Sequence, residues 1–218
     1  MARRSLFTEA DLEAVRQATA EAEARTSGEI VPYVVEQVDD HLEARWAAAA
    51  LGALLFTLAA ELVHHLAGLW GPPLGLWLTL PAWIGATAGY LLAAGVPALA
   101  RLLIPAGILE RRVALRADSA FLHEEVFHTR DRTGILIFLA LFEHRAVILA
   151  DTGIHQAVPQ EQWQQMAHDL AEGIRAGRAA AALIETIRRS GELLAEHRLD
   201  IRPDDINELP DEPRMRER

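Results

Sequence analysis

The feature that most constrains this chain is a long uncharged apolar stretch in its middle. No Asp, Glu, Lys or Arg occurs between Glu61 and Arg101, and residues 46–60 form a second uncharged run rich in Ala and Leu. A membrane-spanning helix needs roughly 20 apolar residues. Residues 46–105 are therefore long enough for two spans and a tight turn, and we expect a transmembrane helical hairpin.

The flanks of this stretch are ordinary soluble sequence, and neither makes a good domain alone because small units bury too little surface. Residues 1–45 offer one helix and one strand, whereas residues 106–198 offer the remaining elements. We therefore predict one soluble domain in two parts, interrupted by the hairpin at 46–105. Residues 199–218, rich in Pro and charge, are expected to form a disordered tail.

Composition excludes several classes of protein. The chain has 218 residues and no Cys, which rules out disulfides and Cys-zinc sites. Its formal net charge of −10 argues against nucleic acid as a partner, because neutralising phosphates needs clustered basic residues. The first 45 residues contain no short apolar segment typical of a secretory signal. The hairpin itself is then the expected insertion signal.

The arginines near the spans predict the sidedness of the membrane protein. They are Arg45 before the first span and Arg101, Arg111, Arg112 and Arg116 after the second. The turn at residues 64–76 contains no Arg. Positive residues favour the cytoplasmic side. We therefore expect a multi-pass protein of the bacterial inner (cytoplasmic) membrane with both soluble parts in the cytoplasm.

The limits of the two spans are less constrained than their number. The first is expected at residues 46–65, whereas the second fits either residues 77–97 or residues 83–103, since several prolines interrupt the run. Tryptophan is enriched at membrane–water interfaces. We therefore assign the tryptophans of this region to the membrane interface, namely Trp46, Trp70, Trp77 and Trp83.

Three ionisable residues lie at the far end of the first span: Glu61, His64 and His65. One interpretation places them at the outer interface, where they reach water, because burying charge in lipid is costly. The other is a proton or ion relay. A single acidic residue in a two-helix hairpin favours the first interpretation.

Before the hairpin, Thr8 and Asp11 have the spacing of a helix-capping box, which predicts a helix over residues 9–25. Residues 29–38 are rich in Val and Ile and predict a strand. Pro32 lacks a backbone donor, so this strand is expected to lie at a sheet edge or to begin at the proline.

After the hairpin, the pattern predicts helices and strands in the order helix 110–127, strand 134–142, strand 145–150, a helix from Gln160 and a helix at 178–197. The unbroken apolar run at 134–142 is typical of a strand covered on both faces. The two-residue connection to the next strand requires an antiparallel hairpin. A strand, a crossover helix and a second strand make a parallel βαβ unit, so the fold class is α/β, with the membrane hairpin inside the crossover.

This topology sorts polar residues onto two rims of the sheet. One collects Glu36, Asp39, Glu143, His144 and Arg145. The other collects Ser27, Glu29, Arg130, Asp131, Thr133, Asp151 and Thr152. Three carboxylates with nearby hydroxyls and loop carbonyls suit Ca²⁺ or Mg²⁺, and such a metal could polarise a phosphoryl oxygen.

We therefore take Glu29, Asp131 and Asp151 as candidate metal ligands, supported by Ser27, Thr133, Gly134, Thr152 and Gly153. The alternative is structural. Carboxylates at strand ends commonly pair with Arg, and Arg130 and Arg132 are available as partners. Structural ion-pair networks of this kind often mimic functional sites. No phosphate-binding glycine loop and no nucleophile elbow occurs in the sequence, so no catalytic residue is assigned.

Five short segments occur in a characteristic order: a first helix, Thr26-Ser27-Gly28-Glu29-Ile30, Thr133-Gly134-Ile135-Leu136-Ile137, Ala150-Asp151-Thr152-Gly153-Ile154, and Trp163. This order resembles the TPM domain family, which contains the thylakoid-lumen acid phosphatase, the photosystem II repair protein and many bacterial membrane-tethered proteins. The resemblance covers about residues 7–45 and 107–197. It implies an α/β/α sandwich with a Rossmann-like mixed sheet, and it makes phosphatase activity a candidate.

The chain departs from the usual plan of this family, which is a secreted domain with a terminal anchor, because its membrane segment lies inside the domain. Two functions follow. The first is an adaptor that helps a membrane complex to assemble or turn over, with the lipid bilayer and other membrane proteins or a second copy as partners. The alternative is a divalent-metal-dependent phosphatase that uses the carboxylate rim. Transport is disfavoured, because two spans would have to oligomerise to form a pathway.

Overall fold

The computed structural model describes residues 7–68, 75–155, 157–197 and 208–216. The chain divides into two compact units. One unit, called here the α/β unit, contains Met1–Val38 and Glu110–Arg218, and the other, called the hairpin unit, contains Asp39–Leu109. Residues far apart in the sequence thus share the α/β unit.

The α/β unit is built on a four-stranded mixed sheet with the order β3-β2-β1-β4. Its strands are β1 (Glu29–Val35), β2 (Gly134–Ala140), β3 (Arg145–Ala150) and β4 (Arg214–Arg216). β1 and β2 are parallel along their whole length, β2 and β3 are antiparallel, and β4 is parallel to β1. The predicted ladder between the strands on either side of the membrane stretch is confirmed.

Pro32 lies inside β1 without interrupting the ladder to β2. The Glu29 N–H donates toward β2, to Thr133 O at 3.1 Å, whereas the Ile30 and Glu36 N–H groups point to the other side. Because parallel strands alternate the direction of their N–H groups, Pro32 lacks its donor on the side away from β2. The prediction of an edge strand is wrong, since β4 adds beyond β1 at Tyr33, Val34 and Val35.

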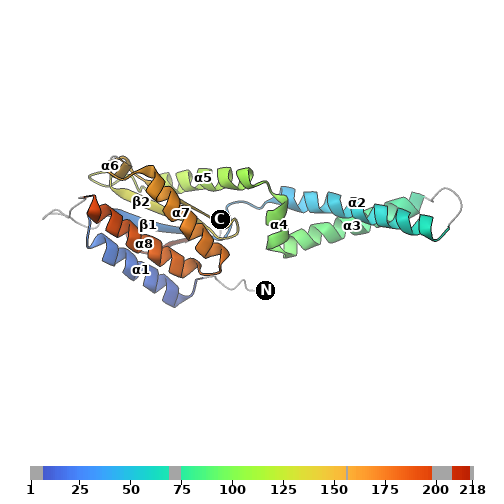
Figure 1. The fold of residues 1–218 in the computed structure, drawn as a ribbon, viewed down its shortest axis with the longest axis horizontal. Helices are drawn as coiled ribbons and strands as arrows, with labels where there is room; N and C mark the ends of the chain where they lie inside the picture. The colour runs from blue at the N-terminus through green and yellow to red at the C-terminus, as the bar shows by residue number, and fades with distance from the viewer. Residues whose placement is uncertain (1–6, 69–74, 156, 198–207, 217–218) are drawn as a thin grey trace. The chain divides into compact units, whose positions relative to one another are not determined.

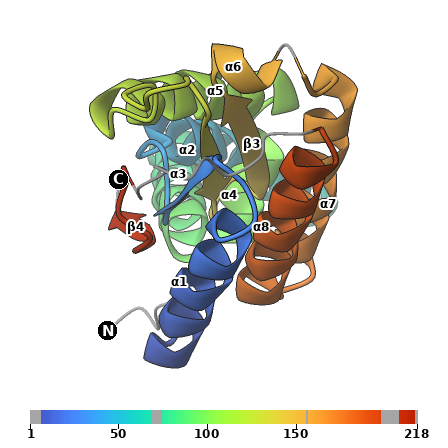
Figure 2. The ribbon, with the colours of Figure 1, turned by 90° about the vertical axis from the view of Figure 1, so that its left-hand side faces the viewer.

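Helices cover both faces of the sheet (Figures 1 and 2). One face carries α1 (Glu9–Glu23), α7 (Gln160–Arg175) and α8 (Ala179–Glu196), and the other carries α5 (Ala106–His123). Alternate side chains of β2 enter the two cores: Ile135 and Ile137 on the first face, Leu136 and Phe138 on the second. All seven residues of β2 are buried, which explains its uninterrupted apolar sequence.

Most predicted elements are present with ends shifted by a few residues. The Thr8 side chain accepts from the Asp11 N–H and the Asp11 carboxylate accepts from the Thr8 N–H, so the predicted capping box is confirmed. A short helix, α6 (Thr152–His155), was not predicted.

The expectation of a disordered tail is wrong for residues 208–216. Their last three residues form β4, and Leu209 and Met215 pack against the two cores. Partial burial of these apolar side chains and pairing with β1 offset the polar composition on which the expectation of disorder was based. Residues 199–207, 217 and 218 lie outside the described part of the chain.

The hairpin unit consists of α2 (Leu42–Leu66), α3 (Gly75–Gly95) and the short α4 (Pro97–Leu103). α3 contains Pro81 and ends before Val96, whose backbone is extended. Of the two alternatives for the second span, residues 83–103 are therefore not one continuous helix.

Glycines allow α2 and α3 to cross closely. A Cβ atom added at Gly52 would collide with the backbone of Gly85, and one at Gly89 would collide with the backbone of Ala48. Close backbone approach through small residues is typical of helix pairs in membranes.

The large side chains of these two helices point outward. Those that are exposed include Leu51, Leu54, Leu55, Leu58, Leu62, Leu80, Trp83, Ile84, Leu91 and Leu92. By length and composition, both helices qualify as membrane spans. An apolar exterior around a core of small residues is the arrangement expected where lipid is the solvent.

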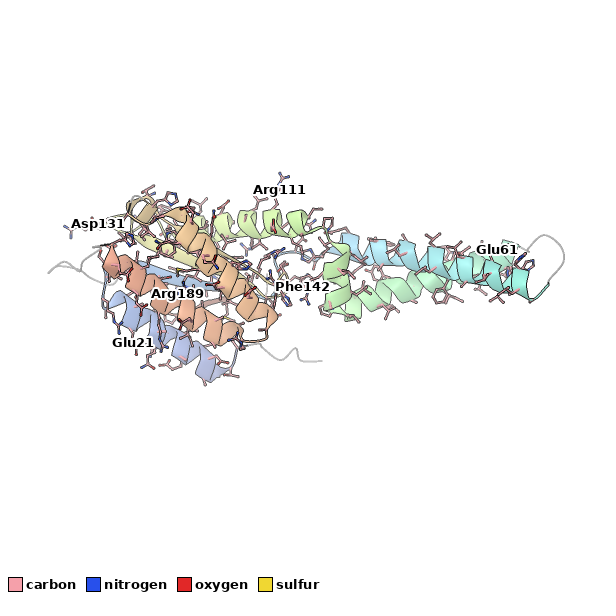
Figure 3. The ribbon with its side chains drawn as sticks, in the orientation of Figure 1. Glu21, Glu61, Arg111, Asp131, Phe142 and Arg189 are labelled. Carbon is pink, nitrogen blue, oxygen red and sulfur yellow. The ribbon has the colours of Figure 1, made fainter. Side chains whose placement is uncertain are left out.

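The tryptophans of the hairpin unit lie at different positions along the helices. Trp46 meets Tyr90 edge-on with ring centroids 5.5 Å apart, and Trp77 lies 6.1 Å from the His64 ring near the opposite end. Trp83 is exposed further along α3, and Trp70 lies outside the described residues. Glu61 is close to the loop end of α2 (Figure 3).

Candidate functional site

The first predicted ligand, Glu29, begins β1 and is buried. Its Oε1 atom accepts from the backbone N–H of Glu208 at 3.1 Å, and its Oε2 atom accepts from that of Leu209 at 3.4 Å. Both carboxylate oxygens are thus occupied by the C-terminal segment. Glu29 therefore holds the chain's own backbone.

The second, Asp151, follows β3 and is also buried. Its Oδ1 atom accepts from the Thr152 N–H at 2.6 Å and from the Thr152 hydroxyl at 3.3 Å. Its Oδ2 atom lies 2.8 Å from Arg132 Nε, an ion pair that lacks the alignment of a hydrogen bond. Asp151 thereby fixes the start of α6 and ties it to the loop before β2.

The other residues of this rim make local backbone contacts. The Thr133 hydroxyl donates to Ser27 O at 2.8 Å, joining the starts of β1 and β2. A Cβ atom at Gly134 would collide with the carbonyl of Val126, and one at Gly153 with the carbonyl of Asp131. The two glycines are therefore explained by close backbone approach.

The third predicted ligand, Asp131, is partly exposed in the loop before β2 and lies at the end of the α/β unit (Figure 3). Within the described residues, no group of three or more His, Asp and Glu side chains is arranged to hold a metal ion. The residues that the sequence analysis grouped thus do not converge on one cation. Because the three carboxylates do not converge, the donor set they offer in this structure does not fit Ca²⁺ or Mg²⁺, which take six or more oxygen ligands.

A different acidic group lies beside Glu29. Glu23, at the end of α1, accepts from the Ile30 N–H at 2.8 Å through one carboxylate oxygen, and its other carboxylate oxygen is buried. Burial, followed by the nearby charges of Glu29 and Asp211, raises the pKa of Glu23 to about 8. The raised pKa favours the protonated form of Glu23 at neutral pH.

Residues 208–216, called here the C-terminal strap, make further polar contacts with the loops that follow α5. The Arg130 N–H donates to Glu208 at 2.9 Å. Arg214 and Arg216 lie 3.3 and 3.4 Å from the two carboxylate oxygens of Glu124. Sequence reasoning missed Glu23, Glu124 and Asp211, because no local pattern links a helix end to a segment almost 190 residues later.

The opposite rim is also held by internal contacts. Buried Glu143 accepts from the Val38 N–H at 3.0 Å, and Arg145 lies 3.2 Å from Glu110. A groove of about 600 Å³ runs between β3 and α7, and the one carboxylate that lines it is Glu110. This groove offers no pair of acids for hydrolytic chemistry.

Comparison with known proteins supports the fold. The NMR structure of the BA42 protein from the psychrophilic bacterium Bizionia argentinensis is similar, with a TM-score of 0.58 and 18% sequence identity over 99% of both chains. Likeness at this identity concerns the fold alone. No family model and no curated protein matches the sequence.

Proposed function

We propose that this protein is a membrane-anchored, TPM-like α/β domain that acts as an adaptor for the assembly or turnover of a membrane complex. The observation that carries this proposal is the hairpin unit, whose helices bury small residues and present large apolar ones. Such a surface suits lipid and the spans of other membrane proteins. We further propose that the α/β unit faces the cytoplasm, on the basis of the arginines around the spans.

The contacts of the carboxylates favour an adaptor over an enzyme. Glu29 accepts two backbone N–H groups, and Asp151 is bound by Thr152 and Arg132. A catalytic metal needs several ligands that converge on one point, and within the described residues no three acidic or histidine side chains are so grouped.

A photo-crosslinking residue placed at Leu55 or Leu91, both exposed on the hairpin, tests the adaptor in native membranes. We expect a protein adduct of defined mass, and the same residue at buried Ala49 serves as the matched control. Adducts with lipid alone would contradict the adaptor.

The phosphatase alternative has its own test. Ca²⁺ and Mg²⁺ are titrated into the full chain in detergent, and hydrolysis of a phosphate ester is measured. The adaptor predicts no saturable binding and no turnover. Saturable binding that Asp151→Asn abolishes, together with turnover, would instead establish the enzyme.

The sidedness is tested separately. A protease added to the periplasmic side of intact spheroplasts is expected to leave the C-terminal strap uncut, whereas it is cut in inside-out vesicles. Cleavage from the periplasmic side would contradict the cytoplasmic placement.

A further inference from the structure

The outer edge of β1 is covered by a strand that resembles a bound peptide. β4 has three residues, none of them buried, whereas β1 and β2 have seven each and are fully buried. Pro32 has no N–H to offer on this side of β1, so pairing begins only at Tyr33. The last contact is donated by Glu36 to Arg216 O at 3.0 Å.

Charged and polar side chains fasten this strand more than apolar burial does. Glu124 of the loop after α5 receives both Arg214 and Arg216, and Arg214 and Glu124 are both largely shielded from water. Met215, between the two arginines, is only partly buried against the core.

We propose that the outer edge of β1 is a docking surface for an extended Arg–apolar–Arg segment of a partner protein, and that β4 occupies it in cis. Main-chain pairing with Val34 and Glu36 supplies affinity, and Glu124 selects the two arginines. We infer the chemistry of the partner from β4 itself. Side chains alternate along a strand, so Arg214 and Arg216 both lie on the side of Glu124. A partner strand binds by displacing β4, which is short and has no fully buried residue.

The experiment uses the full chain in detergent micelles and a labelled synthetic peptide of residues 208–216. Arg214→Glu combined with Arg216→Glu releases the chain's own strand, and this variant is expected to bind the peptide at least about tenfold more tightly than the wild type, in which β4 competes. The matched control is the same peptide with both arginines replaced by glutamate, expected to bind at least about tenfold more weakly. Adding Glu124→Gln to the variant removes this discrimination.

Equal binding of the two peptides, or no binding to a variant with native circular dichroism, would overturn the proposal. Amide hydrogen exchange of the wild-type chain tests the proposal even if the variant fails to fold. The amides of residues 214–216 are expected to exchange at least about a hundredfold faster than those of residues 136–139, because a displaceable strand opens without global unfolding. Equal protection of the two strands would show β4 to be a permanent part of the sheet.

Discussion

The two units of this protein distribute the same apolar residues in opposite ways. The α/β unit buries large side chains such as Trp163, Phe138 and Ile137 between a sheet and its helices. The hairpin unit buries glycine and alanine between its helices and exposes leucine and tryptophan. In water, the hydrophobic effect favours burial of large apolar side chains, as in the α/β unit. In lipid this driving force is missing, and helices associate through close packing of small residues, as in the hairpin unit. The contrast agrees with the length and composition of α2 and α3, which are long and apolar enough to cross a membrane.

The largest effect should come from emptying the core of the α/β unit. Trp163→Ala removes a side chain that is 1% exposed, and we expect a loss of about 3–5 kcal/mol in unfolding free energy. Leu55→Ala, at a position 63% exposed in the hairpin unit, is the matched control and should change it by less than about 0.5 kcal/mol. Denaturant unfolding in detergent measures both. Equal losses would mean that Leu55 is buried in a protein core.

A charge on the outer face of the hairpin should have the next largest effect. Leu55→Arg places a guanidinium near the middle of α2, and insertion should become less favourable by about 2.5–3.5 kcal/mol. Glu192→Arg on the exposed face of α8 is the control and should leave insertion unchanged. Alkaline extraction of membranes reports both variants. Retention of the Leu55→Arg chain at the wild-type level would contradict a lipid-facing position.

The ion pair at the end of β3 should contribute less. Asp151→Asn keeps a cap for Thr152 but removes the charge that faces Arg132, so we expect a loss of about 1–2 kcal/mol. Asp131→Asn, in the partly exposed loop, should cost less than about 0.5 kcal/mol. Thermal unfolding of the two variants separates these roles. A larger loss of unfolding free energy for Asp131→Asn than for Asp151→Asn would contradict this assignment of roles.

The smallest effect concerns pH and the C-terminal strap. The folded-state pKa of Glu23, about 8, lies above the ordinary value of 4.5, so the folded chain retains a proton that the unfolded chain has released. Stability from this group is complete below about pH 4.5, declines as the pH rises toward 8, and is constant above that.

Glu23→Gln cannot ionise and is expected to flatten this pH dependence. Melting temperatures of the wild type and the variant between pH 5 and 9 provide the measurement. Parallel curves for the two proteins would show that Glu23 does not titrate in this range.

The sequence was most informative where one local pattern determines one structure. The apolar runs predicted the two long hairpin helices and β2, and the Thr8–Asp11 spacing predicted the start of α1. The parallel pairing of β1 with β2 followed from the rule for crossover connections.

The candidate site could be predicted only in part, because its contacts are not local. The sequence placed Glu29 and Asp151 on the rim of the sheet, yet their partners depend on loop geometry. Arg132, which pairs with Asp151, has a left-handed backbone conformation with φ of 59°. Glu29 accepts hydrogen bonds from the backbone N–H groups of Glu208 and Leu209. A polar, Pro-containing tail gives no sign that Leu209 and Met215 will pack against the two cores.

The central claim is that a lipid-embedded hairpin interrupts a single soluble domain. The absence of Cys allows a single spin label to be placed at Leu55→Cys in α2 or at Gln17→Cys in α1. Power-saturation electron paramagnetic resonance of the full chain in vesicles compares collisions with oxygen, which concentrates in lipid, and with a nickel chelate, which remains in water. We expect the label at 55 to collide mainly with oxygen and the label at 17 mainly with nickel. Collisions of both labels mainly with nickel would contradict the account.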